Sequence, residues 1–394
     1  MSNRLIVSLS PHVHSGDSIQ KNMYGVCLAL MPALVASLYF FGLGAAVVLL
    51  TSIVSCVLFE WAIAKFILRR ERTTIMDGSA ILTGILLGFN MPSNLPIWII
   101  VIGALVAIGV GKMTFGGLGQ NPFNPALVGR VFLLISFPAQ MTTWPVSGSV
   151  EYLDAQTGAT PLALMKWAIQ SGDVSVLKDL PSSVDMLVGV HGGSLGEVSA
   201  ILLLIGCLFM IVRKIITWHI PVSFLATCTA IALAFPRIYG FPRIESLQLE
   251  LLNGIVLFTA LFMLNEPTTT PTNPKAKIIY GIMAGVLGMA FRYFGGFEYG
   301  SCFAVLLVNT MDGVIERFAN GEHKKADKKP AKAVQEKPAK KVHCAQPKAK
   351  KDTMDIISEA EDNIDGVLYS TRTISIDEIL KAEAEMNKNR KDGK

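Results

Sequence analysis

The feature that most constrains this chain is a series of ten apolar stretches, each long enough to cross the ~30 Å hydrocarbon core of a bilayer as a straight or broken helix. The first five stretches cover 22–41, 43–66, 78–90, 95–115 and 124–138, and the second five cover 197–212, 219–236, 248–264, 276–292 and 300–317. This pattern predicts an all-α polytopic membrane protein with ten transmembrane helices.

Charged residues are scarce outside the C-terminal region, because only 16% of the chain is Asp, Glu, Lys or Arg and its mean hydropathy is +0.47. Residues 321–394 alone hold 17 of the 35 basic and 14 of the 30 acidic residues. The preceding part is too apolar for a soluble enzyme. The positive excess lies in a lysine-rich tail, so it gives no reason to expect a nucleic-acid partner.

Five regions follow from this distribution. We expect a cytoplasmic segment over 1–21, a five-helix repeat over 22–138, an external loop over 139–196, a second five-helix repeat over 197–318 and a charged cytoplasmic tail over 319–394. The tail is predicted to be mostly disordered, since residues 321–351 carry eleven lysines against three acids among Ala and Pro. Its later part contains SIDEILKAEAEMNK, a candidate short helix. The tail either tethers the protein to anionic lipid or a partner, or is only solvated.

Lysine and arginine gather on one face when successive helix ends are assigned to alternate sides of the membrane. That face collects Arg4, Lys21, Lys65, Arg69, Arg70, Arg72, Lys112, Arg213, Lys214, Lys275, Lys277 and Arg317, and the other only Lys166, Lys178, Arg237, Arg243 and Arg292. The positive-inside rule places both termini in the cytoplasm and the 139–196 loop outside. We expect a multi-pass protein of the inner (cytoplasmic) membrane without a cleavable signal peptide.

The two halves contain similar segments. DGSAILTGILLGFNMP at 77–92 shares Gly, Thr, Asn and Pro in similar order with NGIVLFTALFMLNEP at 253–267. On the predicted topology the first copy runs outward and the second inward, which indicates an inverted repeat of five helices. In such repeats, short interrupted helices meet near the midplane and form a site.

The external loop contains the strongest local motif, D-A-Q-T-G-A-T from Asp154 to Thr160. The flexible pair Gly158 and Ala159 leaves the hydroxyl of Thr160 open to an incoming group, and Asp154 could orient it or bind a metal in a modifying enzyme. By composition alone, however, this stretch with Thr157 is a turn.

A second candidate is GGSLGEVSA, residues 192–200, which is predicted to open the sixth helix. Its backbone N–H groups and Ser194 could face a phosphate or a ring. The alternative is a capping box, with Ser194 as N-cap and Glu197 three residues later.

Polar residues inside the apolar stretches form a possible intramembrane path. Asn121 and Asn124 precede Arg130, which lies about two turns inside the fifth helix and is costly there unless it meets a partner. Asp77 begins the third helix and Glu266 follows the eighth. These residues have either a structural role or a role in moving flavin electrons or ions. The six cysteines include no CxxC pair, so no metal or iron–sulfur site and no catalytic residue is predicted.

Several of these segments, in the same order, resemble the NqrB/RnfD family of redox-driven ion pumps, on its RnfD side. They are SPHVHSGDSIQKNMYGVCLALMPAL, MDGSAILTGILLGFNMP, GGLGQNPFNPALVGRVFL, GGSLGEVSA, NEPTTTPTNPKAKIIYG and the threonine motif, and the likeness runs from about Ser8 to Arg317. The SPH start directly before the first helix favours RnfD over NqrB. Glu266 stands where the family is expected to have Asp.

The resemblance implies that Thr160 carries FMN, attached through its phosphate by a flavin transferase, with Asp154, Thr157, Gly158 and Ala159 as the recognised motif. It also implies a second, noncovalent flavin (riboflavin) and partner subunits resembling RnfA, RnfB, RnfC, RnfE and RnfG. The chain would then relay electrons between ferredoxin and NAD and couple them to Na⁺ or H⁺ transport. It would be a subunit of a membrane oxidoreductase rather than a catalyst alone, since it lacks a dinucleotide fingerprint.

Two other functions are compatible with the hydropathy pattern. Inverted repeats with Gly and Pro breaks also describe solute channels and permeases, and FNPA at 123–126 is similar to the half-helix motif of water channels. A membrane scaffold subunit is the third. Only a flavoprotein requires the threonine motif.

Overall fold

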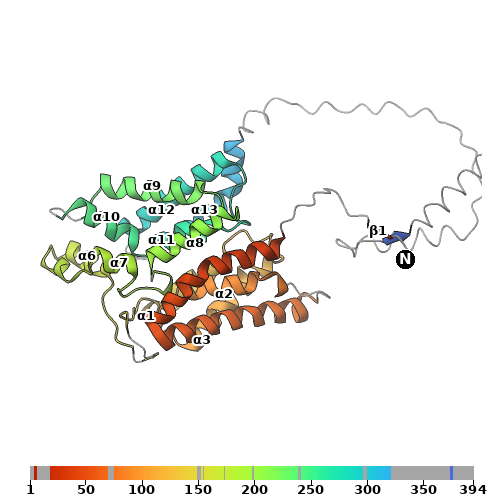
Figure 1. Cartoon of the computed structure of the whole chain (residues 1–394), viewed down its shortest axis with the longest axis horizontal. Helices are drawn as coiled ribbons and strands as arrows, with labels where there is room; N and C mark the ends of the chain where they lie inside the picture. Colours follow the sequence, from red (N-terminus) through yellow and green to blue (C-terminus); the bar gives the residue numbers. More distant parts are fainter. Residues whose placement is uncertain are drawn as a thin grey trace, which may run out of the picture. The chain divides into compact units, whose positions relative to one another are not determined.

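The computed structural model describes residues 4–6, 18–69, 75–148, 152–153, 155–172, 174–197, 199–237, 241–295, 300–320 and 373–375 of the chain. Contacts divide the chain into two compact units, one made of Met1–Gly16 with Ala331–Lys394 and the other of Asp17–Pro330. The elements of the larger unit are all helices (Figure 1).

The smaller unit contains a short antiparallel ribbon. β1 (Arg4–Ile6) pairs with β2 (Thr373–Ser375), and Leu5 faces Ile374. The all-α prediction therefore holds for the larger unit and not for this ribbon. Three-residue strands are too short to leave a readable alternation in the sequence. The rest of the predicted disordered tail and its candidate helix lie outside the described residues.

In the larger unit, nine of the ten apolar stretches coincide with helical segments. In chain order the elements are α1 (Ile19–Ala62), η1 (Ile63–Ile67), η2 (Ile75–Asp77), α2 (Ser79–Phe89), α3 (Ile97–Leu105), η3 (Val106–Val110), η4 (Met113–Phe115), α4 (Pro125–Ser136), α5 (Pro138–Met141), α6 (Pro161–Ser171), η5 (Val174–Asp179), α7 (Ser183–Val188), η6 (Leu195–Glu197), α8 (Ala200–Val212), α9 (His219–Ala234), α10 (Arg243–Leu252), α11 (Val256–Leu261), η7 (Met263–Asn265), α12 (Pro274–Phe294) and α13 (Gly300–Ala319). The remaining stretch, 248–264, which is the eighth in chain order, is described below.

The element α1 contains the first two predicted stretches, which meet at Gly42. Gly42 has φ 53° and ψ −130°, a backbone conformation that glycine adopts far more readily than other residues. Tyr24 lies 3.2 Å from the position that a Cβ of Gly78 would occupy. Ile53 lies 2.6 Å from the corresponding position of Gly84, in α2. In a straight helix Tyr24 and Ile53 would be about 44 Å apart, so α1 folds back at Gly42 and both halves contact α2.

Three helical stretches are long and apolar enough to span a membrane: Ile19–Ile67, Ile97–Phe115 and Pro274–Phe294. A fourth is the pair Arg243–Leu252 and Val256–Asn265, which is bent by 61° at the break. The stretch over 248–264 is therefore a broken helix, one of the two forms expected for it. The helix breaks at Gly254, whose φ is 70°. The apolar helices α2, α4, α8 and α9 have 11 to 16 residues and are shorter than a straight span requires.

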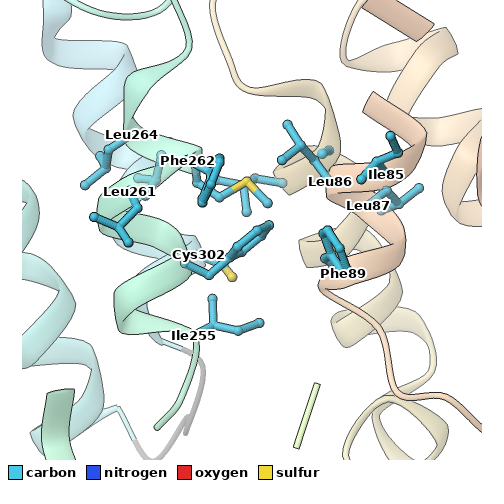
Figure 2. Packing of buried hydrophobic residues seen from close by; sticks show 14 of the residues in the cluster. Ile85, Leu86, Leu87, Phe89, Ile255, Leu261, Phe262, Leu264 and Cys302 are labelled. Atoms are coloured by element: carbon cyan, nitrogen blue, oxygen red, sulfur yellow. The ribbon is translucent and has the colours of Figure 1, made fainter. Parts of the chain in front are cut away.

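The two short helices α2 and α11 face each other across part of the apolar core (Figure 2). The rings of Phe89 and Phe258 meet edge to face with centroids 5.6 Å apart. Leu87 and Leu264 are fully buried on either side, and Cys302 from α13 lies between them. Interdigitation of large side chains thus fixes the two half-helices against one another.

A second, smaller apolar cluster lies under the predicted external loop. It joins α6, η5, α7 and α10 through Leu162, Met165, Ala168, Leu177, Met186 and Leu249. The 139–196 loop is therefore a folded subdomain that packs against α10, at the end of α10–α11 that contains the break.

Candidate functional site

The threonine motif lies against the segment that follows α5. The backbone N–H of Val146 donates to the carbonyl of Gln156 at 2.8 Å, and that of Gly158 donates to the carbonyl of Trp144 at 3.1 Å. These bonds form a single antiparallel bridge that aligns the chain before Thr160. Asp154, the first residue of the motif, lies outside the described residues.

Thr160 is the N-cap of α6. Its Oγ1 accepts a hydrogen bond from the backbone N–H of Ala163 at 3.1 Å, and Pro161 occupies the first helical position. Thr157, Gly158 and Ala159 are exposed, as predicted for an accessible motif, but only 3% of Thr160 is exposed. The prediction that the Thr160 hydroxyl is open to an incoming group is therefore wrong for this structure, because the residue is buried as the cap of a helix that the sequence analysis did not predict.

This position suits a phosphate ester. The N-terminus of the eleven-residue helix α6 carries a partial positive charge and backbone N–H groups directed out of the helix. A phosphodiester on the Oγ1 of Thr160 would lie at that end, beside the exposed Gly158 and Ala159. The helix N-terminus thus suits an anion, but to carry one the Oγ1 of Thr160 would have to release the N–H of Ala163 and turn toward Gly158 and Ala159.

Ser194 does not cap the sixth helix, and this prediction is corrected. The helix α8 begins at Ala200 and is capped by Ser199, whose Oγ accepts from the N–H of Leu202. Ser194 precedes the short turn η6, and its N–H and Oγ donate to Glu197 Oε2 at 2.8 and 3.3 Å. Ser199 is the residue directly before α8 and is therefore the one whose side chain caps it.

Glu197 connects this turn to the half-helix α11. Its Oε1 accepts from the N–H of Ile255 at 2.6 Å, just before α11 begins. Leu195 donates its N–H to the carbonyl of Met91 at the end of α2, and Gly196 approaches Phe89 so closely that a Cβ would lie 2.9 Å from its carbonyl oxygen. The loop that follows the threonine motif therefore inserts between the half-helices.

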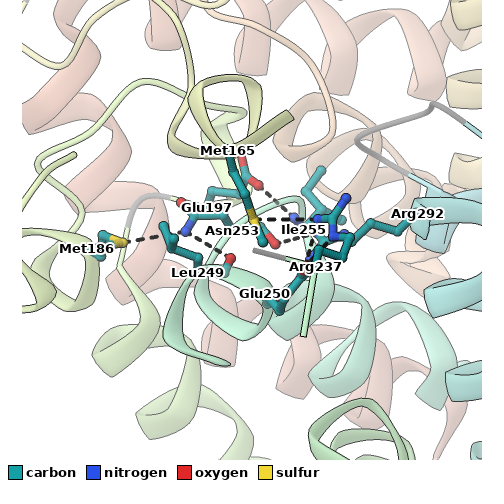
Figure 3. Close-up of polar contacts among 9 residues, drawn as sticks. All are labelled: Met165, Met186, Glu197, Arg237, Leu249, Glu250, Asn253, Ile255 and Arg292. Carbon is teal, nitrogen blue, oxygen red and sulfur yellow. Dashed lines mark hydrogen bonds and ion pairs between the residues drawn. The ribbon is translucent and has the colours of Figure 1, made fainter. Parts of the chain in front are cut away.

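A buried charge cluster connects the same region to α12 (Figure 3). Arg237 and Arg292 both bind the carboxylate of Glu250, at 2.6 and 3.0 Å. Arg292 also donates to the backbone carbonyls of Glu250 and Asn253, and Arg237 reaches the sulfur of Met165 in α6. The sequence analysis assigned the two arginines only to a membrane face, and it did not identify Glu250. An acidic residue one turn before a Gly break in an apolar run could have indicated a functional position there.

A comparable cluster lies at the start of α2. Lys112 Nζ is 2.6 Å from Glu60 Oε2 and 2.6 Å from Ser79 Oγ. Asp77, one of the predicted path residues, accepts from the N–H and hydroxyl of Ser79. Asp77 is therefore part of the structure that holds the N-terminus of α2. Glu60 and Lys112 were not predicted to pair, because 52 residues separate them.

Asn121, Asn124 and Glu266 meet at a cavity of about 50 Å³ between the two halves of the bundle. Asn121 Nδ2 donates to Glu266 Oε1 at 3.1 Å. Asn124 caps α4 and donates to the carbonyl of Met263. Asn121 Oδ1 and Glu266 Oε2 are buried and accept no hydrogen bond among the described groups.

Arg130 does not join that cavity. It is 1% exposed in α4, and its guanidinium carbon lies 6.0 Å from the ring centroid of Trp144. The backbone carbonyl of Trp144 in turn accepts the hydrogen bond from Gly158. The structure thus separates Arg130 from Asn124 and Glu266 and places it beneath the threonine motif.

The fold and the site together define a polytopic helical membrane protein in which a folded threonine-bearing loop packs against broken half-helices. The chain belongs to the NQR2, RnfD, RnfE family, whose model matches residues 6–325. The resemblance read from the sequence motifs is therefore confirmed.

Curated relatives match over nearly their whole length. The chain is 40% identical to the D subunit of the Na⁺-translocating ferredoxin:NAD⁺ oxidoreductase complex of Acetobacterium woodii, over 80% of this chain and 93% of that protein. It is 38% identical to the D subunit of the proton-translocating ferredoxin:NAD⁺ oxidoreductase complex of Clostridium ljungdahlii, over 80% and 95%. It is 34% identical to the D subunit of an ion-translocating oxidoreductase complex of Yersinia pseudotuberculosis, over 79% and 96%. These relatives are subunits of membrane oxidoreductases.

Proposed function

We propose that this chain is the D-type membrane subunit of an ion-translocating ferredoxin:NAD⁺ oxidoreductase. It would relay electrons through a flavin bound to Thr160. The observation that carries the proposal is the placement of Thr160 at the N-terminus of α6, within a motif typical of flavin attachment. Relatives named as D subunits, matched over 93% or more of their length, support the same assignment.

The covalent group would be FMN, held by a phosphodiester bond to Thr160 and supplied by a flavin transferase. FMN contributes the ability to pass electrons singly. The chain's own residues have defined tasks: the N-terminus of α6 neutralises the phosphate, Gly158 and Ala159 leave room beside it, and Trp144 aligns the motif. Asp154 and Thr157 would be read by the transferase.

We also propose that the two halves form an inverted repeat with ten membrane-embedded helices. Three local features that the two halves share support it. Gly78 and Gly254 both have positive φ before a half-helix. Asn90 and Asn265 both donate their side-chain N–H to the carbonyl four residues earlier, where each half-helix ends.

The third shared feature is a buried basic side chain near the N-terminus of each half-helix. Lys112 follows α3 and binds Ser79 at the start of α2. Arg292 lies at the end of α12 and binds Asn253 just before α11. Each cation also pairs with a buried carboxylate, Glu60 or Glu250. In opposite membrane orientations, these clusters would lie at opposite faces.

The proposed orientation has both termini in the cytoplasm and the Thr160 loop on the outer side of the inner membrane. One observation is consistent with it, and the family resemblance implies the same orientation. The 139–196 loop packs on α10 and Arg237, which the basic-residue distribution assigns to the outer face. The transferase of this family is expected to act on that side.

The cavity at Asn121, Asn124 and Glu266 is our proposed location for the intramembrane step. Its two unpartnered oxygens, Asn121 Oδ1 and Glu266 Oε2, are acceptors that suit an N–H edge of a second, noncovalent flavin or a small cation. Na⁺ and H⁺ both remain candidates for the coupling ion, and relatives of each kind are similar to this chain. Partner subunits resembling RnfA, RnfB, RnfC, RnfE and RnfG would supply the remaining carriers.

A flavin assay tests this proposal against the permease and scaffold alternatives. The chain is produced in cells that contain the transferase, denatured and examined for in-gel flavin fluorescence, and its peptides over 155–166 are weighed. We expect an FMN-sized addition on Thr160, retained in Thr160→Ser if the transferase accepts serine and absent in Thr160→Val. Thr142→Val, in the same loop, is the control and should keep the flavin.

An unmodified wild-type peptide from such cells would reject the flavoprotein assignment and favour a channel or permease. Fluorescence that persists in Thr160→Val would instead reject Thr160 as the attachment site.

A further inference from the structure

The helices α9 and α12 are packed unusually closely and run in the same direction. A Cβ on Gly281 would lie 1.9 Å from Ser223 Oγ, and a Cβ on Gly285 would lie 2.8 Å from the Cβ of Thr227. Both contacts pair residues 58 positions apart, so the helices are parallel. Their N-termini therefore lie at the same end.

Beside this contact the two helices form a shallow apolar groove of about 480 Å³. Its walls are Trp218, His219, Val222, Ser223, Ala226, Thr227, Ala230 and Ile231 from the α9 side and Ile278, Ile282 and Val286 from α12. Its lining includes small side chains, such as Ala226 and Ala230, and branched ones, such as Ile278 and Ile282. In Figure 1, α9 lies at the edge of the larger unit, so the groove is on its outer surface rather than in the core.

Positive charge and interfacial residues gather at one end of the groove. Lys275 is exposed and lies on the same helical face as Ile278 and Ile282, one turn before them. Lys277 Nζ lies 3.2 Å from Thr217 Oγ1, next to Trp218, whose side chain is 53% exposed. Tryptophan and lysine at the end of an apolar surface are typical of the membrane–water boundary.

Polar groups at this end are also available to a ligand. No side chain caps the N-terminus of α9, so its first-turn N–H groups face the same end as the lysines. His219 lines the groove, and its Nδ1 is buried with no hydrogen-bond partner among the described residues.

We propose that this groove is a specific site for an anionic phospholipid. One acyl chain would lie between α9 and α12, and the phosphate would lie among Lys275, Lys277 and the N-terminus of α9. The argument is charge complementarity: a surface that is apolar along its length and cationic at one end matches a molecule with a hydrocarbon tail and an anionic head. A partner's transmembrane helix would match the apolar part but has no need of the cationic end.

Native mass spectrometry of the delipidated complex tests this site. Phosphatidylglycerol and phosphatidylcholine with identical acyl chains are titrated separately, and the affinities are compared. We expect phosphatidylglycerol to bind at least tenfold more tightly, and the double variant Lys275→Gln/Lys277→Gln to lose that preference. Ala226→Leu/Ala230→Leu, which fills the floor of the groove, should weaken both lipids.

Arg243→Gln is the matched control, because this exposed arginine begins α10 and does not line the groove. Equal affinities for the two lipids in the wild type would overturn the proposal, as would a lysine double variant that behaves like Arg243→Gln. A photoreactive probe attached at Ala230→Cys should label lipid. Labelling of another subunit in the complex would show that a protein helix covers the groove and would also overturn it.

Discussion

The charge cluster around Glu250 gives a sharp test of how the half-helix α11 is held. Its carboxylate is 1% exposed and is shared by two guanidinium groups. Glu250→Gln keeps the shape of the side chain but removes the negative charge. Arg292, whose side chain is 2% exposed, would then remain buried without its counter-ion.

The expected cost follows from the asymmetry of buried ion pairs. Removing one partner typically destabilises a protein by about 3–5 kcal/mol, because the other charge stays buried and uncompensated. Arg237 has a side chain 15% exposed and can turn toward water, so Arg292 accounts for most of the loss. For a protein of this size, about 2 °C of melting temperature corresponds to each kcal/mol, which gives a decrease of roughly 6–10 °C.

Thermal unfolding in detergent, followed by size-exclusion chromatography with fluorescence detection, measures this difference. Glu245→Gln is the matched control, because it removes the same charge from an exposed position on α10. The double variant Glu250→Gln/Arg292→Met should be more stable than Glu250→Gln alone, since it no longer buries a lone charge. If Glu250→Gln and Glu245→Gln melt at the same temperature, the cluster does not hold α11 as argued.

Three further predictions concern α1, α2 and the central cavity. Gly84→Ala should destabilise the chain by about 1–3 kcal/mol, because its Cβ would lie 2.6 Å from the Cα of Ile53. Gly313→Ala is the control and should not destabilise the chain, because a Cβ there would have no atom within 4 Å. Equal melting temperatures of the two variants would contradict the close packing of α1 and α2. Gly42→Ala should cost about 1–3 kcal/mol through backbone strain at positive φ, and an unchanged melting temperature would contradict the fold-back. Glu266→Ala should cost about 1–3 kcal/mol, because it removes one acceptor of the buried Asn121 Nδ2, and an unchanged melting temperature would contradict this contact.

Much of the helical framework could be predicted because its boundaries coincide with strong local signals. Asn124 and Pro125 start α4, and Gly42 separates the two halves of α1, as the sequence indicates. A broken helix was allowed for 248–264, but the position of the break between α10 and α11 was not predicted, because apolar residues continue on both sides of Asn253 and Gly254. Hydropathy averages over such a break, although the Asn–Gly pair is a turn signal.

The site was predicted less completely, for a physical reason. The motif around Thr160 is contiguous and could be read directly. Arg292 lies 42 residues from Glu250, and Glu60 lies 52 residues from Lys112. No local pattern specifies a pairing over such distances. Arg130 and Asn124 are close in sequence but face different neighbours, because α4 turns one toward Trp144 and the other toward Met263.

The fold-back at Gly42 also determines how this chain can enter a membrane. No charged residue occurs between Lys21 and Glu60, so the bend carries nothing that would hold it on either side during insertion. Tyr39 stands near the bend and is 83% exposed, whereas Phe41 is buried in the core; an exposed tyrosine is typical of the lipid headgroup region. In the proposed ten-helix arrangement, the two halves of α1 would enter the membrane together as a helical hairpin, and the basic residues at its two ends would keep both ends on the same side.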